Sequence, residues 1–324
     1  MIISNLEEKA LLELANAESY YEGWLAAKRE VSGGTLRWKS VNNTDYLVRL
    51  RNSKGDGSSL GPRSDKTEAI YQSYQAAILR EKDHWNKLHI LGGFLKQLKV
   101  GLIPESAGNI LRQLDIDRAL GTKVFLVGTN AMSAYALEAG VRLSPDIMAT
   151  DDLDITRLPK TPSLDLLDTV KKVDNTFVVN TEKTFQVRNQ KGYEVEVIAG
   201  SGDSFLSDYL KPVVLKGQEW LLLGRPIERV GFDTGLRPVR MIVPDPRLYA
   251  LHKLWLSKSP DRNPLKKNKD KNQALDLIDM VKRFMPHYPF DQDFIAILPK
   301  DLQKIAKEEC VESNVQAPNK KFSQ

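Results

Sequence analysis

Two aspartates, Asp152 and Asp154, are the side chains of this 324-residue sequence whose types and spacing most clearly suggest chemistry. In a strand, residues i and i+2 project to the same face, so the two carboxylates would lie together, about 7 Å apart, while Leu153 and Ile155 face a core. Neighbouring carboxylates repel each other and are costly to desolvate, and Mg²⁺ offsets that cost well. The pair therefore indicates phosphoryl transfer with two Mg²⁺ ions, or Mn²⁺ in their place; a solvated strand end is the simpler alternative.

A glycine turn upstream of this strand adds a feature that suits phosphate binding. Gly128 follows the apolar run 124–127, Thr129 and Asn130 are residue types that begin helices, and 131–139 has a helical pattern. Backbone N–H groups at a helix N-terminus favour an anion, and a glycine lets a phosphate approach closely. We therefore expect Gly128, Thr129 and Asn130 to bind nucleotide phosphates. The alternative is an ordinary strand-to-helix turn, and the spacing is not that of a P-loop.

In this order, the motifs resemble those of the nucleotidyltransferases of the DNA-polymerase-beta-like superfamily, in which an apolar residue and a glycine turn precede D-x-D. The sequence is most similar to a bacterial branch that reads G-[ST]-N-A, then A-G-V, then A-T-x-D-[IL]-D. Those letters stand here at 128–131, 139–141 and 149–154. Two features depart from the wider superfamily: the threonine at position 129 and the gap of about 22 residues before Asp152, which the branch shares.

The resemblance implies an α+β fold, a polymerase-beta-like nucleotidyltransferase core built on a mixed β-sheet. It also implies a third carboxylate on a neighbouring strand, which helps to hold the metal and receives the acceptor's proton. The stretch YEVEVI offers Glu194 and Glu196. Glu196 aligns with the V-D-[LI] of the branch, and Glu194 stays the alternative. The expected catalytic and metal-binding residues are thus Asp152, Asp154 and Glu196.

The resemblance further implies the reaction, in which an acceptor hydroxyl attacks the α-phosphate of a nucleoside triphosphate such as ATP and pyrophosphate leaves. Basic residues bear on the substrates. The stretch 250–271 holds seven Lys or Arg against two acids, which is typical of a solvated face but also of a surface for triphosphate or a nucleic-acid backbone. Lys253 lies within the apolar run ALHKLWL of this stretch and is the expected triphosphate contact.

Near the N-terminus, two alternating runs joined by a pair of asparagines predict a β-hairpin at 35–51. Its basic side chains are interleaved with Trp38 and Tyr46, a combination that binds RNA, although Trp38 is also a typical core residue. The basic side chains are Arg37, Lys39, Arg49 and Arg51.

We therefore expect a Mg²⁺-dependent nucleotidyltransferase whose acceptor is RNA, with the 3′ end of a tRNA, as used by toxin-like relatives, as a specific candidate. A protein hydroxyl or a small molecule such as an antibiotic is the alternative acceptor. A non-catalytic nucleic-acid-binding or regulatory protein is a further alternative, which the presence of both aspartates disfavours. An antitoxin partner would accompany a toxin, but no pattern in one chain indicates it.

The elements that must position these residues fall into three expected regions. Residues 1–119 are predicted to be helical around the basic hairpin, 120–243 to form the nucleotidyltransferase core, and 244–312 to form a C-terminal helical domain. A polar tail at 313–324 is expected to be disordered. More locally we predict strands at 123–127, 153–155, 185–188, 193–198 and 219–223, a glycine- and serine-rich loop at 52–64, and a helix at 66–98 interrupted near Gly92.

The composition is ordinary, with 41% hydrophobic and 27% charged residues and a net charge of +5, which is compatible with an anionic partner without requiring one. No apolar run reaches 18 residues, so no membrane span is expected, and the N-terminus lacks the pattern of a secretory signal. The single cysteine, Cys310, rules out an internal disulfide framework, and no His/Cys cluster suits zinc. A cytoplasmic location is expected.

Overall fold

The computed structural model describes residues 2–51, 55–98, 100, 102–144, 150, 152–201 and 210–311. Asp151 and the tail that was expected to be disordered lie outside these residues. The chain divides into two compact units. The smaller unit is Lys9–Leu98 with Leu236–Pro238, and the larger unit is Met1–Glu8, Lys99–Gly235 and Val239–Gln324. This division does not coincide with the three regions expected from the sequence, whose boundaries stay a prediction.

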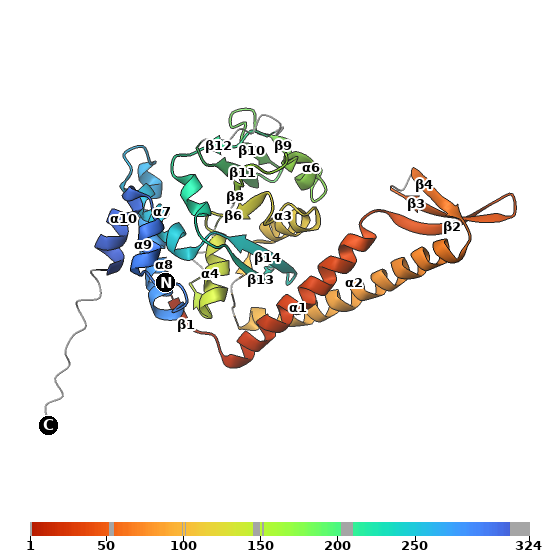
Figure 1. Ribbon diagram of the computed structural model, residues 1–324, viewed down its shortest axis with the longest axis horizontal. Coiled ribbons are helices and arrows are strands. Elements are labelled where there is room, and N and C mark those ends of the chain that lie inside the picture. Colours follow the sequence, from red (N-terminus) through yellow and green to blue (C-terminus); the bar gives the residue numbers. More distant parts are fainter. Residues whose placement is uncertain are drawn as a thin grey trace, which may run out of the picture. The chain divides into compact units, whose positions relative to one another are not determined.

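The smaller unit consists of two long helices and a three-stranded antiparallel sheet (Figure 1). Helices α1 (Glu8–Val31) and α2 (Asp65–Gln97) pack through aromatic side chains, with the rings of Trp24 and Trp85 5.2 Å apart between centroids. Strands β2 (Thr35–Val41) and β3 (Thr44–Leu50) form the predicted hairpin, and β4 (Gly57–Pro62) pairs with β3. The two asparagines of the turn have φ angles of 48° and 60°, as a two-residue hairpin turn requires.

Two expectations for this unit are wrong. Part of the glycine- and serine-rich stretch forms strand β4, because backbone pairing with β3 supplies hydrogen bonds that no side-chain pattern announces. Helix α2 also continues through Gly92 and Gly93. Leu88 and Leu95 on either side are fully buried, and this burial outweighs the cost of about 1 kcal/mol per helical glycine.

The larger unit is built around a mixed sheet, which confirms the expected α+β class. Strands β8 (Asp152–Arg157) and β11 (Glu194–Ala199) are parallel neighbours at its centre. The strand order is β6 (Val124–Leu126), β8, β11, β10 (Gln186–Arg188) and β9 (Val178–Val179), with β12 (Val213–Val214) pairing with β11. Alternate residues of β8 and β11 are buried, so one face of the sheet packs on the core and the other is free for polar side chains.

Two smaller sheets flank this one in the larger unit. The first pairs β1 (Ile2–Asn5) with β7 (Val141–Leu143), and the second has the order β14 (Pro238–Val243), β13 (Ile227–Asp233), β5 (Leu102–Ile103). The helices are α3 (Glu105–Ile116), α4 (Ala131–Ala139), α6 (Leu166–Lys171), α7 (Pro246–Lys258), α8 (Pro264–Phe284), α9 (Gln292–Ile297), α10 (Lys300–Ala306), the 3₁₀ helix η1 (Gln218–Leu222) and the π-helix η2 (Lys307–Val311).

The strand expected at 219–223 is wrong, because this stretch is the helix η1. Gly217 begins it in the left-handed conformation, with φ 82°, and Trp220 then packs edge-on against Trp255 at 4.9 Å between ring centroids. The apolar run thus serves a local aromatic cluster and not a sheet. Helix α7 begins at Pro246, after a cap supplied by the side chain of Asp245. In the described part of the chain, no helix is long and apolar enough to cross a membrane.

Candidate functional site

Four carboxylates gather on one face of the central sheet. The parallel register places Asp152 opposite Glu194 and Asp154 opposite Glu196. The intervening residues of both strands are buried in the core, so the four acidic side chains project together to the other side. Neighbouring strands lie about 4.8 Å apart, so each aspartate stands beside a glutamate of the next strand. We call Asp152, Asp154, Glu194 and Glu196 the carboxylate face.

The glycine turn lies directly against this face. Gly128 has φ 71°, and a Cβ atom built on it would stand 2.1 Å from Oδ2 of Asp154. No other residue fits there without displacing the carboxylate. The backbone N–H of Val127 also donates to the carbonyl of Asp154, at 3.0 Å. The structure therefore brings together the two motifs that the sequence separates by more than 20 positions.

The described residues balance the charge on the carboxylate face only in part. Burial, followed by the charges of Asp152 and Glu196, raises the pKa of Asp154 from 3.8 to about 7. Lys253 and Lys266 oppose the shift but do not cancel it. A carboxyl group with so high a pKa marks a site where positive charge is missing.

The turn residues are fixed by contacts with strand β8. Asn130 occupies the N-cap position of α4, but its side chain makes no cap hydrogen bond and instead donates to the backbone carbonyl of Asp152 at 3.0 Å. Its Oδ1 is buried and accepts no hydrogen bond from the described residues. Thr129 is buried, and the hydroxyl of Thr150 bonds the carboxylate of Asp152. The expected phosphate-binding residues thus lie beside the two aspartates.

Sequence reasoning missed Gln186 on strand β10, which holds the two glutamates. Its fully buried amide nitrogen donates to Glu194 Oε2 at 2.7 Å and to Glu196 Oε1 at 2.8 Å. The amide oxygen of Gln186 accepts from Asn180 at 2.6 Å, which fixes the orientation of the amide. Nothing in the run FQVR signals this role, because it depends on the antiparallel register of β10 and β11.

Sequence reasoning also missed Tyr249 on helix α7. Its hydroxyl donates to the carbonyl of Gly128 at 2.7 Å, and its ring lies 5.4 Å from that of Tyr135 on α4. A buried tyrosine hydroxyl needs a partner, and here the partner is the backbone of the glycine turn. Tyr249 therefore connects helix α7 to the backbone of the glycine turn.

Lys253, the expected triphosphate contact, is buried one turn farther along α7. Its ammonium pairs with Asp270 at 3.0 Å and stands 5.3 Å from the centroid of the Tyr249 ring. Desolvation lowers its pKa, and Asp270 opposes that shift. Arg262 shares Asp270, at 2.7 Å. The lysine thus supports Tyr249 in this structure, and its contact with triphosphate stays a prediction.

The neighbouring His252 has no catalytic environment. Desolvation lowers its pKa to about 3, so the imidazole is neutral, and it packs against Trp255 and Trp220. Lys266, near the start of α8, is exposed, and its positive charge opposes the rise in the pKa of Asp154.

The set of three carboxylates expected to bind metal shares one face but is not drawn tightly together. Among the described residues, no group of three or more His, Cys, Asp or Glu side chains is arranged to hold an ion as it stands. The reason lies partly with Glu196, whose Oε1 is occupied by Gln186. The donor set is nevertheless of the oxygen type that Mg²⁺ prefers, and added positive charge would oppose the rise in the pKa of Asp154.

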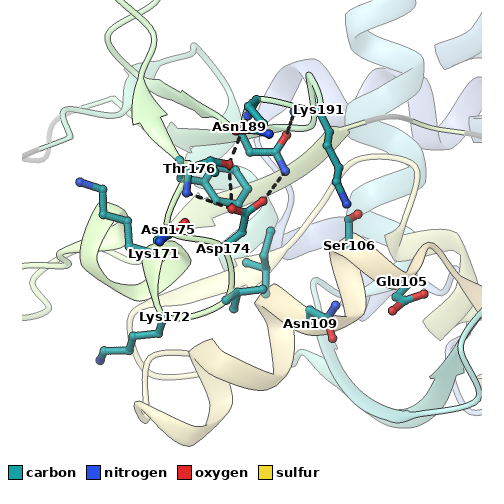
Figure 2. Close-up of a pocket in the computed structure, with 14 residues that line it drawn as sticks. Glu105, Ser106, Asn109, Lys171, Lys172, Asp174, Asn175, Thr176, Asn189 and Lys191 are labelled. Atoms are coloured by element: carbon teal, nitrogen blue, oxygen red, sulfur yellow. Dashed lines mark hydrogen bonds between the residues drawn. The ribbon is translucent and has the colours of Figure 1, made fainter. Parts of the chain in front are cut away.

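The cavity in Figure 2 is a different feature of the larger unit. It measures about 750 Å³, and none of the four carboxylates of the carboxylate face lines it. Much of its polar lining is already satisfied, since Asp174 accepts hydrogen bonds from the backbone and hydroxyl of Thr176 and from the amide of Asn189. We therefore assign the chemistry to the carboxylate face and not to this cavity.

Comparison with known proteins adds one finding to this geometry. Residues 105–298 match a protein family described as nucleotidyltransferase, a stretch that contains the carboxylate face, the glycine turn and helices α7 and α8. No curated protein and no solved structure gave a significant match.

Proposed function

The chain belongs to this nucleotidyltransferase family, and from that premise we propose that it transfers a nucleoside monophosphate from a nucleoside triphosphate to a hydroxyl group of RNA. The observation that supports the proposal is the contact between Gly128 and Asp154 on a face that carries four carboxylates. A turn that admits phosphate and an unbalanced negative site are what a metal-bound triphosphate requires.

In the proposed reaction, an RNA hydroxyl oxygen forms a bond to the α-phosphorus while the bond to the bridging oxygen breaks and pyrophosphate leaves. The Gly128–Thr129 turn and the start of α4 hold the triphosphate through backbone N–H groups. Glu196 accepts the proton of the attacking hydroxyl. Lys253, the expected triphosphate contact, and the exposed Lys266, whose charges both act on Asp154, would contact the leaving phosphates.

Asp152, Asp154 and Glu196 would hold Mg²⁺, with Mn²⁺ as a substitute. When bound, the ion supplies positive charge at the reacting phosphate and lowers the pKa of the attacking hydroxyl. The residues of the chain do the remaining work. Asn130 fixes the backbone of Asp152, Tyr249 fixes the carbonyl of Gly128, and the two aspartates stay on one face because the strand alternates. This positioning and the charges at the site act together on the rate.

RNA is the proposed acceptor because the smaller unit presents exposed basic residues, among them Arg37 and Lys39, on a hairpin with Tyr46. The specific RNA acceptor that we propose is the 3′ end of a tRNA. A protein that modifies tRNA in this way would act as a toxin and would have an antitoxin partner. A protein hydroxyl or a small molecule would give the same chemistry with a different labelled product.

The experiment uses nucleoside triphosphates labelled at the α-phosphate, incubated with the protein, Mg²⁺ and either total RNA or a cell lysate. Label in RNA supports the proposal. Label in protein or in a small molecule would show that RNA is not the acceptor, and the absence of label with every triphosphate would refute the activity. Glu196→Gln should abolish transfer. Glu194→Gln, the same change on the same face of the same strand, is the matched control and should retain most of it.

A further inference from the structure

The three-stranded sheet of the smaller unit has two faces of different character. On the inner face, Leu36 and Leu47 are buried and Trp38 packs against Tyr71 of α2, with 5.7 Å between ring centroids. Since side chains alternate along a strand, the neighbouring residues of β2 and β3 form the opposite, outer face. That face carries Arg37, Lys39, Tyr46 and Val48.

The register places an aromatic side chain at the centre of this outer face and cations beside it. Tyr46 and Val48 stand on the middle strand β3, and they lie opposite Lys39 and Arg37 of β2, respectively. Residues directly opposite in an antiparallel pair share a face, so these four side chains are neighbours. Arg37 and Lys39 are exposed, and they follow each other along the strand at about 7 Å.

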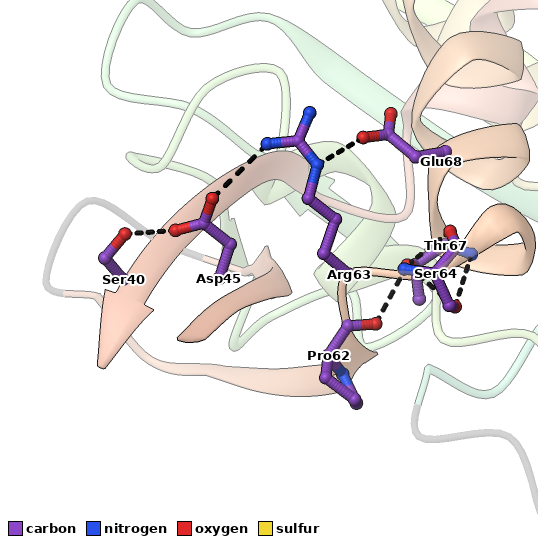
Figure 3. A network of polar contacts seen from close by, with 7 residues as sticks. All are labelled: Ser40, Asp45, Pro62, Arg63, Ser64, Thr67 and Glu68. Carbon is purple, nitrogen blue, oxygen red and sulfur yellow. Dashed lines mark hydrogen bonds and ion pairs between the residues drawn. The ribbon is translucent and has the colours of Figure 1, made fainter. Parts of the chain in front are cut away.

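No acidic side chain competes on the outer face. Asp45 is the only acid among the residues of the three strands, all of which the structure describes, and it shares the inner side with Leu47. There it binds the hydroxyl of Ser40 and the guanidinium of Arg63, which lies 3.3 Å away (Figure 3). Arg63 also pairs with Glu68 of α2 at 2.5 Å. The negative charge of the sheet is thereby neutralised away from Arg37 and Lys39.

The same register divides the four basic residues that the sequence grouped together. Arg49 lies opposite Leu36, so it belongs to the inner side, where its side chain runs beside Gly34. Arg51 follows the end of β3 and is exposed. Only Arg37 and Lys39 therefore stand beside the exposed part of Tyr46.

We infer that the outer face of the β2–β3–β4 sheet binds a single-stranded segment of RNA, with one base stacked on Tyr46 and neighbouring phosphates contacted by Arg37 and Lys39. The inference rests on the proposed function only for the choice of RNA as acceptor. Single-stranded RNA binds through the stacking of bases on aromatic rings and the neutralisation of phosphates by cations. An aromatic ring flanked by cations on an exposed sheet provides both interactions. Stacking and phosphate contacts do not read base edges, so the binding is expected to tolerate different sequences.

The test measures binding of a short, fluorescently labelled single-stranded RNA to the full-length protein by anisotropy, as a function of salt. Asp152→Asn is present in every variant to prevent chemistry. Replacing Arg37 and Lys39 together by Gln removes two phosphate contacts, so the slope of log K against log salt should become shallower by about 1.4. Tyr46→Ala should weaken binding roughly five- to hundredfold, whereas Tyr46→Phe keeps the ring and should bind as the parent does.

Lys82→Gln is the matched control, because Lys82 is an exposed lysine of helix α2 in the same unit but outside the sheet. It should leave both affinity and salt slope unchanged. Parent-like binding by the Arg37/Lys39 variant, or an equal loss with Lys82→Gln, would overturn the inference. Transfer of label to RNA by the wild-type protein is measured separately, so a failed surface and a failed function give different results.

Discussion

Replacing Asp154 by asparagine should make the protein more stable and inactive at the same time. The pKa of Asp154 rises from 3.8 to about 7 in the folded protein, chiefly through burial and then through the charges of Asp152 and Glu196. The folded state therefore binds this proton more tightly than the unfolded state does. Protonated Asp154 therefore stabilises the folded protein. This contribution to the free energy of unfolding is fully present below about pH 4 and is lost as the pH rises through about 7.

The size of the effect follows from the two pKa values. The difference between 3.8 and about 7 corresponds to a loss of about 4 kcal/mol at alkaline pH, as an upper limit for a partly exposed carboxyl group. Asparagine has nearly the same shape and cannot ionise. The variant should then exceed the wild type in stability by up to about 4 kcal/mol near pH 8.5, and by little near pH 4.

The assay is urea unfolding followed by tryptophan fluorescence across this pH range, in chelator, for the wild type and Asp154→Asn. Asp174→Asn is a control of opposite sign, because hydrogen bonds from Thr176 lower the pKa of Asp174 and its ionised form stabilises the fold. That variant should be less stable than the wild type at neutral pH. Mg²⁺ should raise the stability of the wild type and not of Asp154→Asn, since a ligand stabilises only the state that binds it.

A pH-independent difference between wild type and Asp154→Asn would refute the electrostatic reasoning, and so would a destabilised variant at pH 8.5. Retention of nucleotide transfer by a stable Asp154→Asn protein would refute the site assignment instead. The two readouts are independent, so each part of the argument fails separately.

Three further substitutions test the positions around the carboxylate face. Gly128→Ala places a methyl group 2.1 Å from the Asp154 carboxylate, at a φ of 71°. Nucleotide transfer should therefore fall at least about 100-fold, while a thermal unfolding transition shows that the variant still folds. A transfer rate near that of the wild type would contradict the close approach of Gly128 and Asp154. Tyr249→Phe removes the hydrogen bond to the carbonyl of Gly128, so the glycine turn is held less firmly. The variant should show a kcat about tenfold lower with little change in KM, and unchanged steady-state kinetics would show that the hydroxyl is not used. Gln186→Met leaves both glutamates without their shared donor. It should lower the free energy of unfolding by about 1–3 kcal/mol, as measured by chemical denaturation, and should also lower kcat. Glu196→Gln in the same background should abolish the activity that remains, and residual transfer by that double variant would contradict the role of Glu196.

Much of the local structure could be predicted because it depends on neighbours in the sequence. The hairpin at Asn42 and Asn43 and the alternating strand that carries Asp152 both follow from short-range rules. The errors have the opposite origin. Strand β4 exists because β3 pairs with it, and η1 exists because Trp220 meets Trp255 from a distant helix.

The candidate site shows the same division. Asp152 and Asp154 could be assigned to one face from the period of a strand, and the choice of Glu196 followed from a resemblance. Gln186 and Tyr249 could not be found in this way, because a glutamine amide and a tyrosine hydroxyl gain their roles only from the groups they meet. Lys253 was singled out by its apolar surroundings, and those surroundings are also why it is buried against Asp270.

The sequence by itself determined which residues can carry negative charge on one side of a strand, which glycine precedes a helix, and that these belong to nucleotidyl-transfer chemistry. Alternation and capping act over a few residues, so they are readable along the chain. Only the tertiary structure decided that Gly128 touches Asp154, that Glu196 stands opposite it, and that Arg37 and Lys39 share a face with Tyr46 while Arg49 does not. Those contacts depend on strand register and packing, which many distant residues set together.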